Sequence, residues 1–349
     1  MNIYLCSTLR HFLFATLKSL SDRDELSHII VITDQQGLDP NRFELSVLPS
    51  TISVEFVERK QILDSVYGGG VGLVHKLFAT ANISSKFFRE RTLRKLDECG
   101  LLNSEYGLKG TTLYLFNDRN RLARLMRLAF VEYEVIEDGL SNYTGSKLSF
   151  AELYVLSKKG RRFIGDDKRC TAIHLLTPKL AASQLKSKVK LINFISHINV
   201  NSYIYPLFKV DKSEVFVPEV IIATQPISIG NMNESECDIA VYKKMVDYLK
   251  IKKHSYAFKV HPRENETKYR VVFPDADFIE SKIPLELLVF SSCESPIVLS
   301  IYSSAGMGFE DYCHRVTLIK DEEAENQADI YVQWQKDRID IDKRLEEIF

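Results

Sequence analysis

The sequence predicts an α/β fold in which two Rossmann-like, doubly wound domains face a central cleft. The chain has 349 residues, which is more than one small core needs and enough for two domains. In both halves, short runs rich in β-branched and aromatic residues alternate with helix-like segments. This alternation is typical of a mostly parallel sheet. Polar motifs follow three of these runs, and open α/β sheets bind their ligands at the carboxyl ends of strands.

The first half, residues 1–210, is expected to form one domain. Its predicted strands are 1–6, 28–33, 52–57, 111–116, 130–136 and 171–176. Its predicted helices are 9–20, a long one over 71–99, and 120–128.

The second half, residues 211–349, repeats this rhythm, and residues 183–211 are the expected connector. Its predicted strands are 220–223, 256–260, a short one near 278, 297–302 and 316–319. Helices are predicted over 237–249, from Pro284 and from Ala305. The charged segment 330–349 has a helical pattern, and we expect it to pack back on the first domain.

Two α/β domains across a cleft are typical of GT-B glycosyltransferases and also of periplasmic binding proteins. Residues 1–6 form a short apolar run with no basic region, and polar residues follow, so we expect a first strand rather than a signal peptide. This expectation counts against the periplasmic class. No stretch of about 18 apolar residues occurs, so no membrane-spanning helix is expected.

The net charge and the cysteines further restrict the classes of function that the sequence allows. The chain carries 46 Lys and Arg against 47 Asp and Glu, a net charge of -1, so nucleic acid is not expected as its main partner. The scattered cysteines include no C-x-x-C pair, which favours reduced thiols in a cytoplasmic protein over disulfides or a zinc site. They are Cys6, Cys99, Cys170, Cys237, Cys293 and Cys313.

The first polar motif is Glu137-Asp138-Gly139, which follows the strand expected over 130–136. A carboxylate at such a strand end can take the proton from an attacking hydroxyl, and the glycine admits a substrate close to the chain. An Asx-type turn would explain the same residues without catalysis. Side chains alternate along a strand, so Glu137 points away from Asp138 and is the weaker candidate.

The second motif is His261-Pro262, after the strand expected to end at residue 260. The proline fixes its own φ and biases the histidine toward an extended backbone. There the imidazole could donate to a phosphate oxygen and offset the charge that builds on a leaving group. A structural polar contact is the competing interpretation.

The third motif is Ser303-Ser304, between the strand 297–302 and the helix expected from Ala305. Hydroxyls at a helix N-terminus can cap the helix, and the same end of a helix binds anions. Between the second and third motifs lies Glu286, in the first turn of the helix from Pro284. The helix dipole alone would favour an acid there, and a contact to ribose hydroxyls is the functional alternative.

Taken in this order, the motifs resemble the acidic-acidic-Gly, His-Pro and Ser/Thr-Ser motifs of bacterial sialyltransferases, notably the lipooligosaccharide sialyltransferases and the capsular polysialyltransferases. They comprise few residues but span most of the chain. The resemblance implies a GT-B fold, transfer from CMP-sialic acid with inversion, and no metal cofactor. It also implies a lipooligosaccharide or capsular glycan as acceptor, and a cytoplasmic enzyme with a candidate peripheral contact at the inner face of the membrane.

Carried over by position, the resemblance implies that Asp138 is the general base and that His261, beside Pro262, is the ligand of the CMP phosphate. Ser303 and Ser304 correspond to the phosphate-binding hydroxyls. Glu286 corresponds to the acid that binds the ribose. The first motif reads Glu-Asp where several relatives have Asp-Asp, which weakens any role for Glu137.

Two alternatives remain open. Capsular CMP-Kdo transferases also carry Glu-Asp-Gly, Gln-Pro and His-Pro elements, so Thr224-Gln225-Pro226 keeps another CMP-activated 2-keto sugar acid such as Kdo in consideration. A non-catalytic nucleotide- or sugar-binding protein of the same two-domain build is the other alternative. The sequence leaves open the acceptor sugar, the linkage, the number of residues added and the oligomeric state.

Other motifs carry less weight. Asn117 and Asp118, after the strand over 111–116, are candidates for acceptor contacts, although a helix N-cap at Asp118 or Asn120 would also explain them. The pairs 275/277 and 340/342 match the Asp-x-Asp of metal-dependent glycosyltransferases, but a chain with this many acids contains such pairs by chance. Glycines 68–72 lack both the P-loop lysine and the dinucleotide spacing and indicate a flexible loop.

Overall fold

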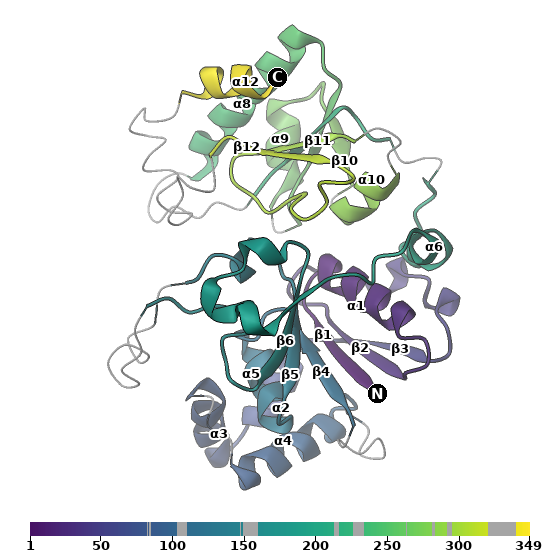
Figure 1. Ribbon diagram of the computed structural model, residues 1–349, viewed down its shortest axis with the longest axis vertical. Helices are drawn as coiled ribbons and strands as arrows, with labels where there is room; N and C mark the ends of the chain where they lie inside the picture. The colour runs from purple at the N-terminus through teal and green to yellow at the C-terminus, as the bar shows by residue number, and fades with distance from the viewer. Residues whose placement is uncertain are drawn as a thin grey trace. The chain divides into compact units, whose positions relative to one another are not determined.

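In the computed structural model the chain forms two compact units, Met1–Val210 and Asp211–Phe349, which are taken here one at a time (Figure 1). The structure describes residues 1–81, 83, 85–102, 110–146, 148, 160–212, 216–225, 234–262, 264–280, 283–291, 295–319 and 340–349.

The first unit contains a seven-stranded parallel sheet of order β3-β2-β1-β4-β5-β6-β7. The order reverses between β1 and β4, which makes this the switch point where doubly wound sheets bind ligands. The strands are β1 Asn2–Cys6, β2 Ser27–Ile32, β3 Ile52–Val57, β4 Thr112–Leu115, β5 Tyr133–Ile136, β6 Cys170–Leu175 and β7 Val189–Leu191.

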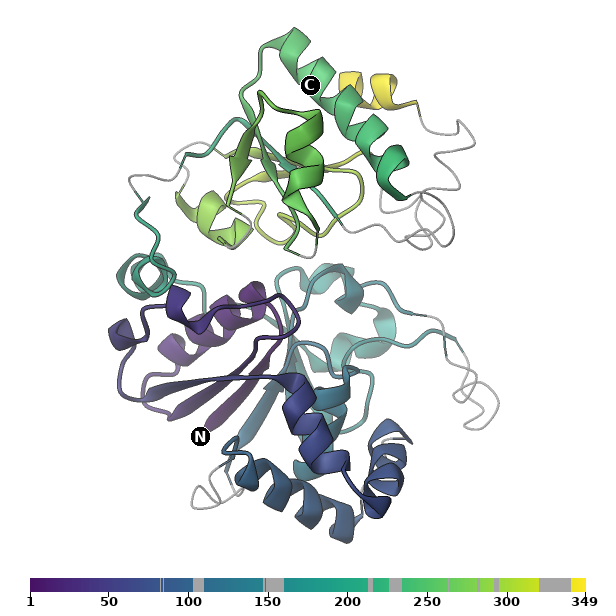
Figure 2. The ribbon, with the colours of Figure 1, turned by 180° about the vertical axis from the view of Figure 1, so that it is seen from behind.

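Helices lie on both faces of this sheet (Figures 1 and 2). They are α1 Leu9–Ser21, α2 Arg59–Tyr67, α3 Gly70–Ala81, α4 Lys86–Glu98 and α5 Arg121–Ala129, with α6 His197–Asn199, η8 Val200–Ile204 and α7 Tyr205–Leu207 near the end of the unit. The long helix expected over 71–99 is two helices, because Ser85 starts a new one: its side chain accepts a hydrogen bond from the backbone N–H of Phe88. Asn120 caps α5 in the same way.

The second unit contains a parallel sheet of order β10-β9-β8-β11-β12, again with the reversal beside its first strand. Its strands are β8 Val220–Ala223, β9 Tyr256–Lys259, β10 Asp277–Ile279, β11 Ile297–Ser300 and β12 His314–Thr317. Its helices are α8 Glu234–Lys252, α9 Glu266–Val272, α10 Leu285–Ser291 and α12 Ile341–Ile348. Ile221, Ala257 and Leu288 form part of the core between sheet and helices.

The helix predicted from Ala305 is wrong. Residues 305–308 form turns, because Gly306 and Gly308 adopt φ values of +78° and +80°, outside the right-handed helical region. The segment Glu266–Val272, which the sequence analysis left unassigned, is the helix α9.

The C-terminal helix α12 packs against α8 of its own unit, and the expected contact with the first domain stays a prediction. Lys244 Nζ lies 2.7 Å from Asp342 Oδ2, and the ring of Phe349 contacts Tyr248 with centroids 5.8 Å apart. Residues 330–339 of that predicted segment lie outside the described residues.

Cys6, Cys99, Cys170 and Cys313 are free thiols. Cys293 and the side chain of Cys237 lie outside the described part of the chain. No helix within the described residues is both long and apolar enough to span a bilayer.

Candidate active site

Asp138 lies just beyond β5, at the edge where the carboxyl ends of β1, β4 and β5 meet. His11 reaches this edge from the first turn of α1, which begins after Thr8 caps it by accepting the backbone N–H of His11. Asn117 arrives from the end of β4. Three segments far apart in sequence therefore place polar side chains at the switch point of the sheet.

The carboxylate of Asp138 is held from two sides. His11 Nε2 lies 2.6 Å from Oδ1, and Asn117 Nδ2 donates to Oδ2 over 3.3 Å. Ser141 Oγ lies 3.5 Å from Oδ2. The Asp138 side chain is 22% exposed, whereas that of His11 is 3% exposed. Oδ2 therefore has only long contacts and keeps the capacity to accept another proton donor.

The environment of Asp138 favours the carboxylate. Burial raises its pKa, but the hydrogen bond with His11, the amide of Asn117 and the charge of Arg10 together outweigh burial and hold the pKa below its usual value. Asp138 is accordingly deprotonated near neutral pH, the state that a general base requires.

The proton of the His11 ring can be assigned from its two contacts. The backbone N–H of Ser7 donates to Nδ1 over 3.1 Å, so Nδ1 is an acceptor and carries no proton. The ring proton is then on Nε2, directed at Asp138. Phe116 stacks on the imidazole with centroids 4.2 Å apart, which fixes the ring plane. His11 thus orients Asp138 and has no second nitrogen available for a substrate.

The neighbours of Asp138 in its motif have structural roles. The side chain of Glu137 is fully buried; Arg10 Nη2 lies 3.1 Å from it, the backbone N–H of Leu176 donates to it over 2.8 Å, and Tyr143 donates its hydroxyl. Gly139 adopts φ 138° and ψ −148°, a region open essentially to glycine alone. Both features hold the loop that carries Asp138.

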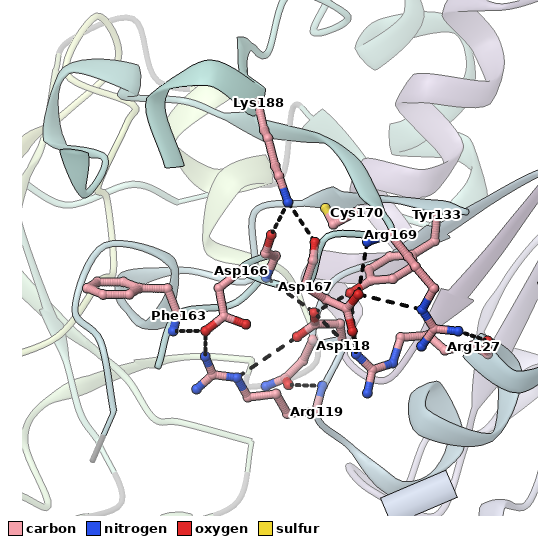
Figure 3. A network of polar contacts seen from close by, with 12 residues as sticks. Asp118, Arg119, Arg127, Tyr133, Phe163, Asp166, Asp167, Arg169, Cys170 and Lys188 are labelled. Carbon is pink, nitrogen blue, oxygen red and sulfur yellow. Dashed lines mark hydrogen bonds and ion pairs between the residues drawn. The ribbon is translucent and has the colours of Figure 1, made fainter. Parts of the chain in front are cut away.

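Asp118 lies in a network of polar contacts with Tyr133 and Arg127 (Figure 3). It is 2% exposed, and its Oδ2 accepts the hydroxyl of Tyr133 over 2.7 Å and the backbone N–H of Gly165 over 3.2 Å. Arg127 Nη1 lies 3.8 Å from the same oxygen. This burial gives Asp118 a structural role, and of the predicted pair only Asn117 contacts Asp138.

In the second unit, two side chains at the end of β8 tie the neighbouring strand ends together. Thr224 Oγ1 accepts the backbone N–H of His261, which follows β9, over 2.9 Å. Gln225 Oε1 accepts the backbone N–H of Tyr302, which follows β11, over 2.9 Å. Both side chains are buried. Pro226, the third residue of that motif, lies outside the described residues.

His261 and Pro262 are half-buried at this edge, and their loop is anchored through Glu264. Glu264 accepts from Thr224 Oγ1 over 2.5 Å and from the Tyr269 hydroxyl over 2.7 Å. Burial raises the pKa of Glu264 although both hydrogen bonds oppose the shift. The position of His261 is therefore set by β9, by Thr224 and by this half-buried acid.

Glu286 is buried, 6% exposed, in the first turn of α10. The nearby Lys259, the last residue of β9, is also buried and donates from Nζ to the carbonyl of Glu280 over 2.7 Å. Burial lowers the pKa of Lys259 to about 7, and the attraction of Glu286, Glu280 and Glu266 only partly restores it. Lys259, whose pKa is lowered to about 7, thus lies close to Glu286, the predicted ribose ligand.

Ser303 and Ser304 follow β11 in a turn and do not start a helix. Ser303 Oγ accepts the backbone N–H of Ala305 over 3.1 Å, and its own hydroxyl proton can still be donated. Arg315 Nε and Nη2 donate to the carbonyl of Ser303 over 3.0 and 2.7 Å. The turn is therefore held by a guanidinium from β12.

No three His, Cys, Asp or Glu side chains within the described ranges gather in a way that could hold a metal ion. Of the Asp-x-Asp pairs, Asp340 caps α12 by accepting the backbone N–H of Lys343, and Asp342 pairs with Lys244.

Sequence reasoning missed His11, Lys259 and Arg315. His11 sits five residues after the first predicted strand, and this place near a strand end was the only signal for it. Lys259 and Arg315 lie within strands, where nothing in the sequence marks their contacts.

Comparisons with known proteins place this geometry in context. A family model of glycosyltransferase family 52 matches residues 75–321, more than half of the chain. The structure is similar to an α/β-galactoside α-2,3-sialyltransferase from Photobacterium phosphoreum, with 15% identity, a TM-score of 0.52, and coverage of 95% of this chain and 94% of that one. It is also similar to the GT-B domain of a Photobacterium damselae sialyltransferase, with 13% identity, a TM-score of 0.50 and 98% of each chain covered. No curated protein sequence matches. The structural likeness confirms the predicted GT-B fold.

Proposed function

The chain belongs to glycosyltransferase family 52, and on that basis we propose that it transfers sialic acid from CMP-sialic acid to a hydroxyl of a lipooligosaccharide or capsular glycan, with inversion. The observation that carries the proposal is the Asp138 carboxylate. It is deprotonated, partly exposed and oriented by His11 at the switch point of the first sheet. A carboxylate held in this way suits the removal of a proton from an acceptor hydroxyl.

In the proposed reaction, the acceptor oxygen forms a bond to the anomeric carbon of the donor. The bond from that carbon to the phosphate oxygen breaks, and its electron pair leaves with CMP. The hydroxyl proton passes to Oδ2 of Asp138, the oxygen whose present contacts are the longer ones. The reacting sugar is cation-like in the transition state, so the phosphate must be stabilised as its charge grows.

We assign the stabilisation of the phosphate to the second unit. His261 and Ser303 lie at the ends of strands that flank β8, and Thr224 and Gln225 tie their loops to it. An imidazole and the hydroxyls of Ser303 and Ser304 can each donate to a phosphate oxygen. Because Ala305 does not start a helix, these groups and the backbone of the turn take the place of the predicted helix N-terminus. Glu286 remains the proposed ribose ligand, and no metal is included.

The acceptor side is proposed at Asn117 and Ser141, the two side chains beside Oδ2 of Asp138. We also propose a cytoplasmic location, since the scattered cysteines fit a reducing compartment.

The decisive assay follows CMP release from CMP-sialic acid in the presence of a galactose-terminated acceptor, with CMP-Kdo as the competing donor. We expect Asp138→Asn to bind CMP normally and to lose activity by a factor on the order of 100 or more. Asp34→Asn is the matched control: this acid follows β2 at the same edge, is 24% exposed and pairs with Arg59, so its variant should keep most of the activity. If the enzyme prefers CMP-Kdo over CMP-sialic acid, the proposed donor becomes CMP-Kdo. Binding of CMP sugars without release of CMP would favour the non-catalytic alternative.

A further inference from the structure

Arg10 brings a positive charge close to the Asp138 carboxylate. It lies in the first turn of α1, next to His11, at the edge of the sheet where β1 ends (Figure 1). Burial raises the pKa of Asp138, and the charge of Arg10 is one of the influences, after His11 and Asn117, that hold this pKa below its usual value. A cation that lowers the pKa of a carboxylate also makes it a weaker base. Removal of a proton therefore does not explain why a guanidinium lies here.

Two contacts fix the guanidinium of Arg10. Its Nη2 lies 3.1 Å from Oε1 of Glu137, whose side chain is fully buried. Its Cζ lies 4.9 Å from the centre of the Phe14 ring, one turn further along α1. The Arg10 side chain is nevertheless 16% exposed. A planar guanidinium has five N–H donors, so it can bind the carboxylate of a ligand while it keeps its contact with Glu137.

The donor in the proposed reaction carries a carboxylate on the very carbon that reacts. When Asp138 takes the proton, the acceptor oxygen must lie about 3 Å from Oδ2 and about 3 Å from the anomeric carbon. The carboxyl carbon of the sugar is only one bond, about 1.5 Å, from the anomeric carbon. The sugar carboxylate therefore comes within about 8 Å of Asp138. Like charges at this distance repel each other, and a cation close to both offsets the repulsion.

From these observations we propose that Arg10 binds the carboxylate of the transferred sugar and selects acidic sugars over neutral ones. This assignment rests on the proposed function, since it requires the sugar of the donor to reach Asp138. Glu137 is then a positioning residue, because it orients the guanidinium from a place that is fully buried. Sialic acid and Kdo both carry this carboxylate, so Arg10 recognises the class of sugar that they share and does not distinguish between them.

The test compares ligands that carry or lack the negative charge. Calorimetry without acceptor measures the binding of CMP-sialic acid, of its C1 amide and of CMP. The wild type should bind the acid at least about tenfold more tightly than the amide, the effect of one hydrogen bond between charged groups. Arg10→Gln should bind the acid and the amide equally and should keep its affinity for CMP. Arg10→Lys, which keeps the charge, should retain part of the preference for the acid.

The measurements are made at pH 8, so that Asp138 is ionised with or without Arg10; a carboxyl group ordinarily titrates near pH 4, about four units lower. Arg10→Gln leaves Glu137 buried without its cation, which can destabilise the fold. The double variant Arg10→Gln with Glu137→Gln removes both partners and should show the same loss of preference. Circular dichroism confirms that each variant is folded.

Arg59→Gln is the matched control. Arg59 follows β3 at the same edge of the sheet, and its Nη2 lies 3.4 Å from Oδ2 of Asp34. This variant should prefer the acid as the wild type does. Equal binding of the acid and the amide by the wild type would overturn the assignment, and so would an unchanged preference in the double variant. If the wild type binds the acid through Arg10 but releases no CMP with an acceptor, the proposed function fails and the carboxylate site stands.

Discussion

Replacement of Lys259 by methionine should change how the stability of the protein depends on pH. Lys259 is 7% exposed at the end of β9, and burial lowers its pKa to about 7. An unfolded lysine keeps its proton up to a pH of about 10.5. Between these values the unfolded state binds one more proton than the folded state, so the free energy of unfolding rises with pH.

The size of this contribution follows from the two pKa values. The rise is at most about 1.4 kcal/mol per pH unit, and the full penalty at and below pH 7 is roughly 4 to 5 kcal/mol. Between pH 7 and pH 9.5, about 3 kcal/mol of this penalty disappears. Methionine has no proton to release. The amount by which the unfolding free energy of Lys259→Met exceeds that of the wild type should therefore be about 3 kcal/mol smaller at pH 9.5 than at pH 7. The substitution also removes the hydrogen bond from Lys259 to the Glu280 carbonyl. That loss changes the difference in unfolding free energy by the same amount at every pH, so it does not alter how the difference depends on pH.

Urea denaturation followed by far-UV circular dichroism at several pH values between 7 and 9.5 measures the difference. Other titrating groups act on both proteins, so they cancel when the two are subtracted. Lys244→Met is the control, because Lys244 is an exposed residue of α8 paired with Asp342. Its difference from the wild type should stay constant. If the Lys259→Met difference is equally flat, the lysine does not release its proton near pH 7 and the reasoning is refuted.

Three further predictions concern the site. Activity should survive EDTA, since a donor with one phosphate can be held by His261, two hydroxyls and backbone N–H groups; loss on chelation with rescue by magnesium or manganese would contradict this. His261→Ala should weaken CMP binding in calorimetry and slow transfer, whereas His254→Ala, which loses a contact to Glu219, should do neither. Gly139→Ala should lower the unfolding free energy by about 1 to 3 kcal/mol, because φ 138° is strained for any other residue, and unchanged stability with full activity would argue against it.

The sequence predicted the parallel sheets, the GT-B fold and the glycosyltransferase family, and all three are confirmed. The periodicity of a strand involves neighbouring residues, and the order of motifs is read directly along the chain. Both can therefore be recognised in a single sequence. The resemblance to bacterial sialyltransferases is likewise confirmed at the level of family and fold. The roles given to Asp138, His261, Glu286, Ser303 and Ser304 stay predictions that the variants above test.

The errors have physical causes. The helix expected from Ala305 fails because two glycines take positive φ values, and a glycine in the sequence does not state which φ it adopts. The partner of Asp138 was not predicted because His11 lies 127 residues earlier, and their contact depends on the order of strands in the sheet. The different roles of Asn117 and Asp118 follow from the direction of adjacent side chains at the end of β4.

In the proposed reaction either residue of the pair His11–Asp138 could serve as the general base, and the contact of His11 with Ser7 favours Asp138. If the histidine were the base, its free nitrogen would have to face the acceptor while the acid held the other. Here Nδ1 accepts the Ser7 N–H and Nε2 faces the acid, so both nitrogens are engaged inside the unit. The ring is also 3% exposed, against 22% for the Asp138 side chain. In the proposed reaction the proton of the acceptor hydroxyl would therefore go to Asp138 and not on through His11, and it would leave from the carboxyl group to product or solvent.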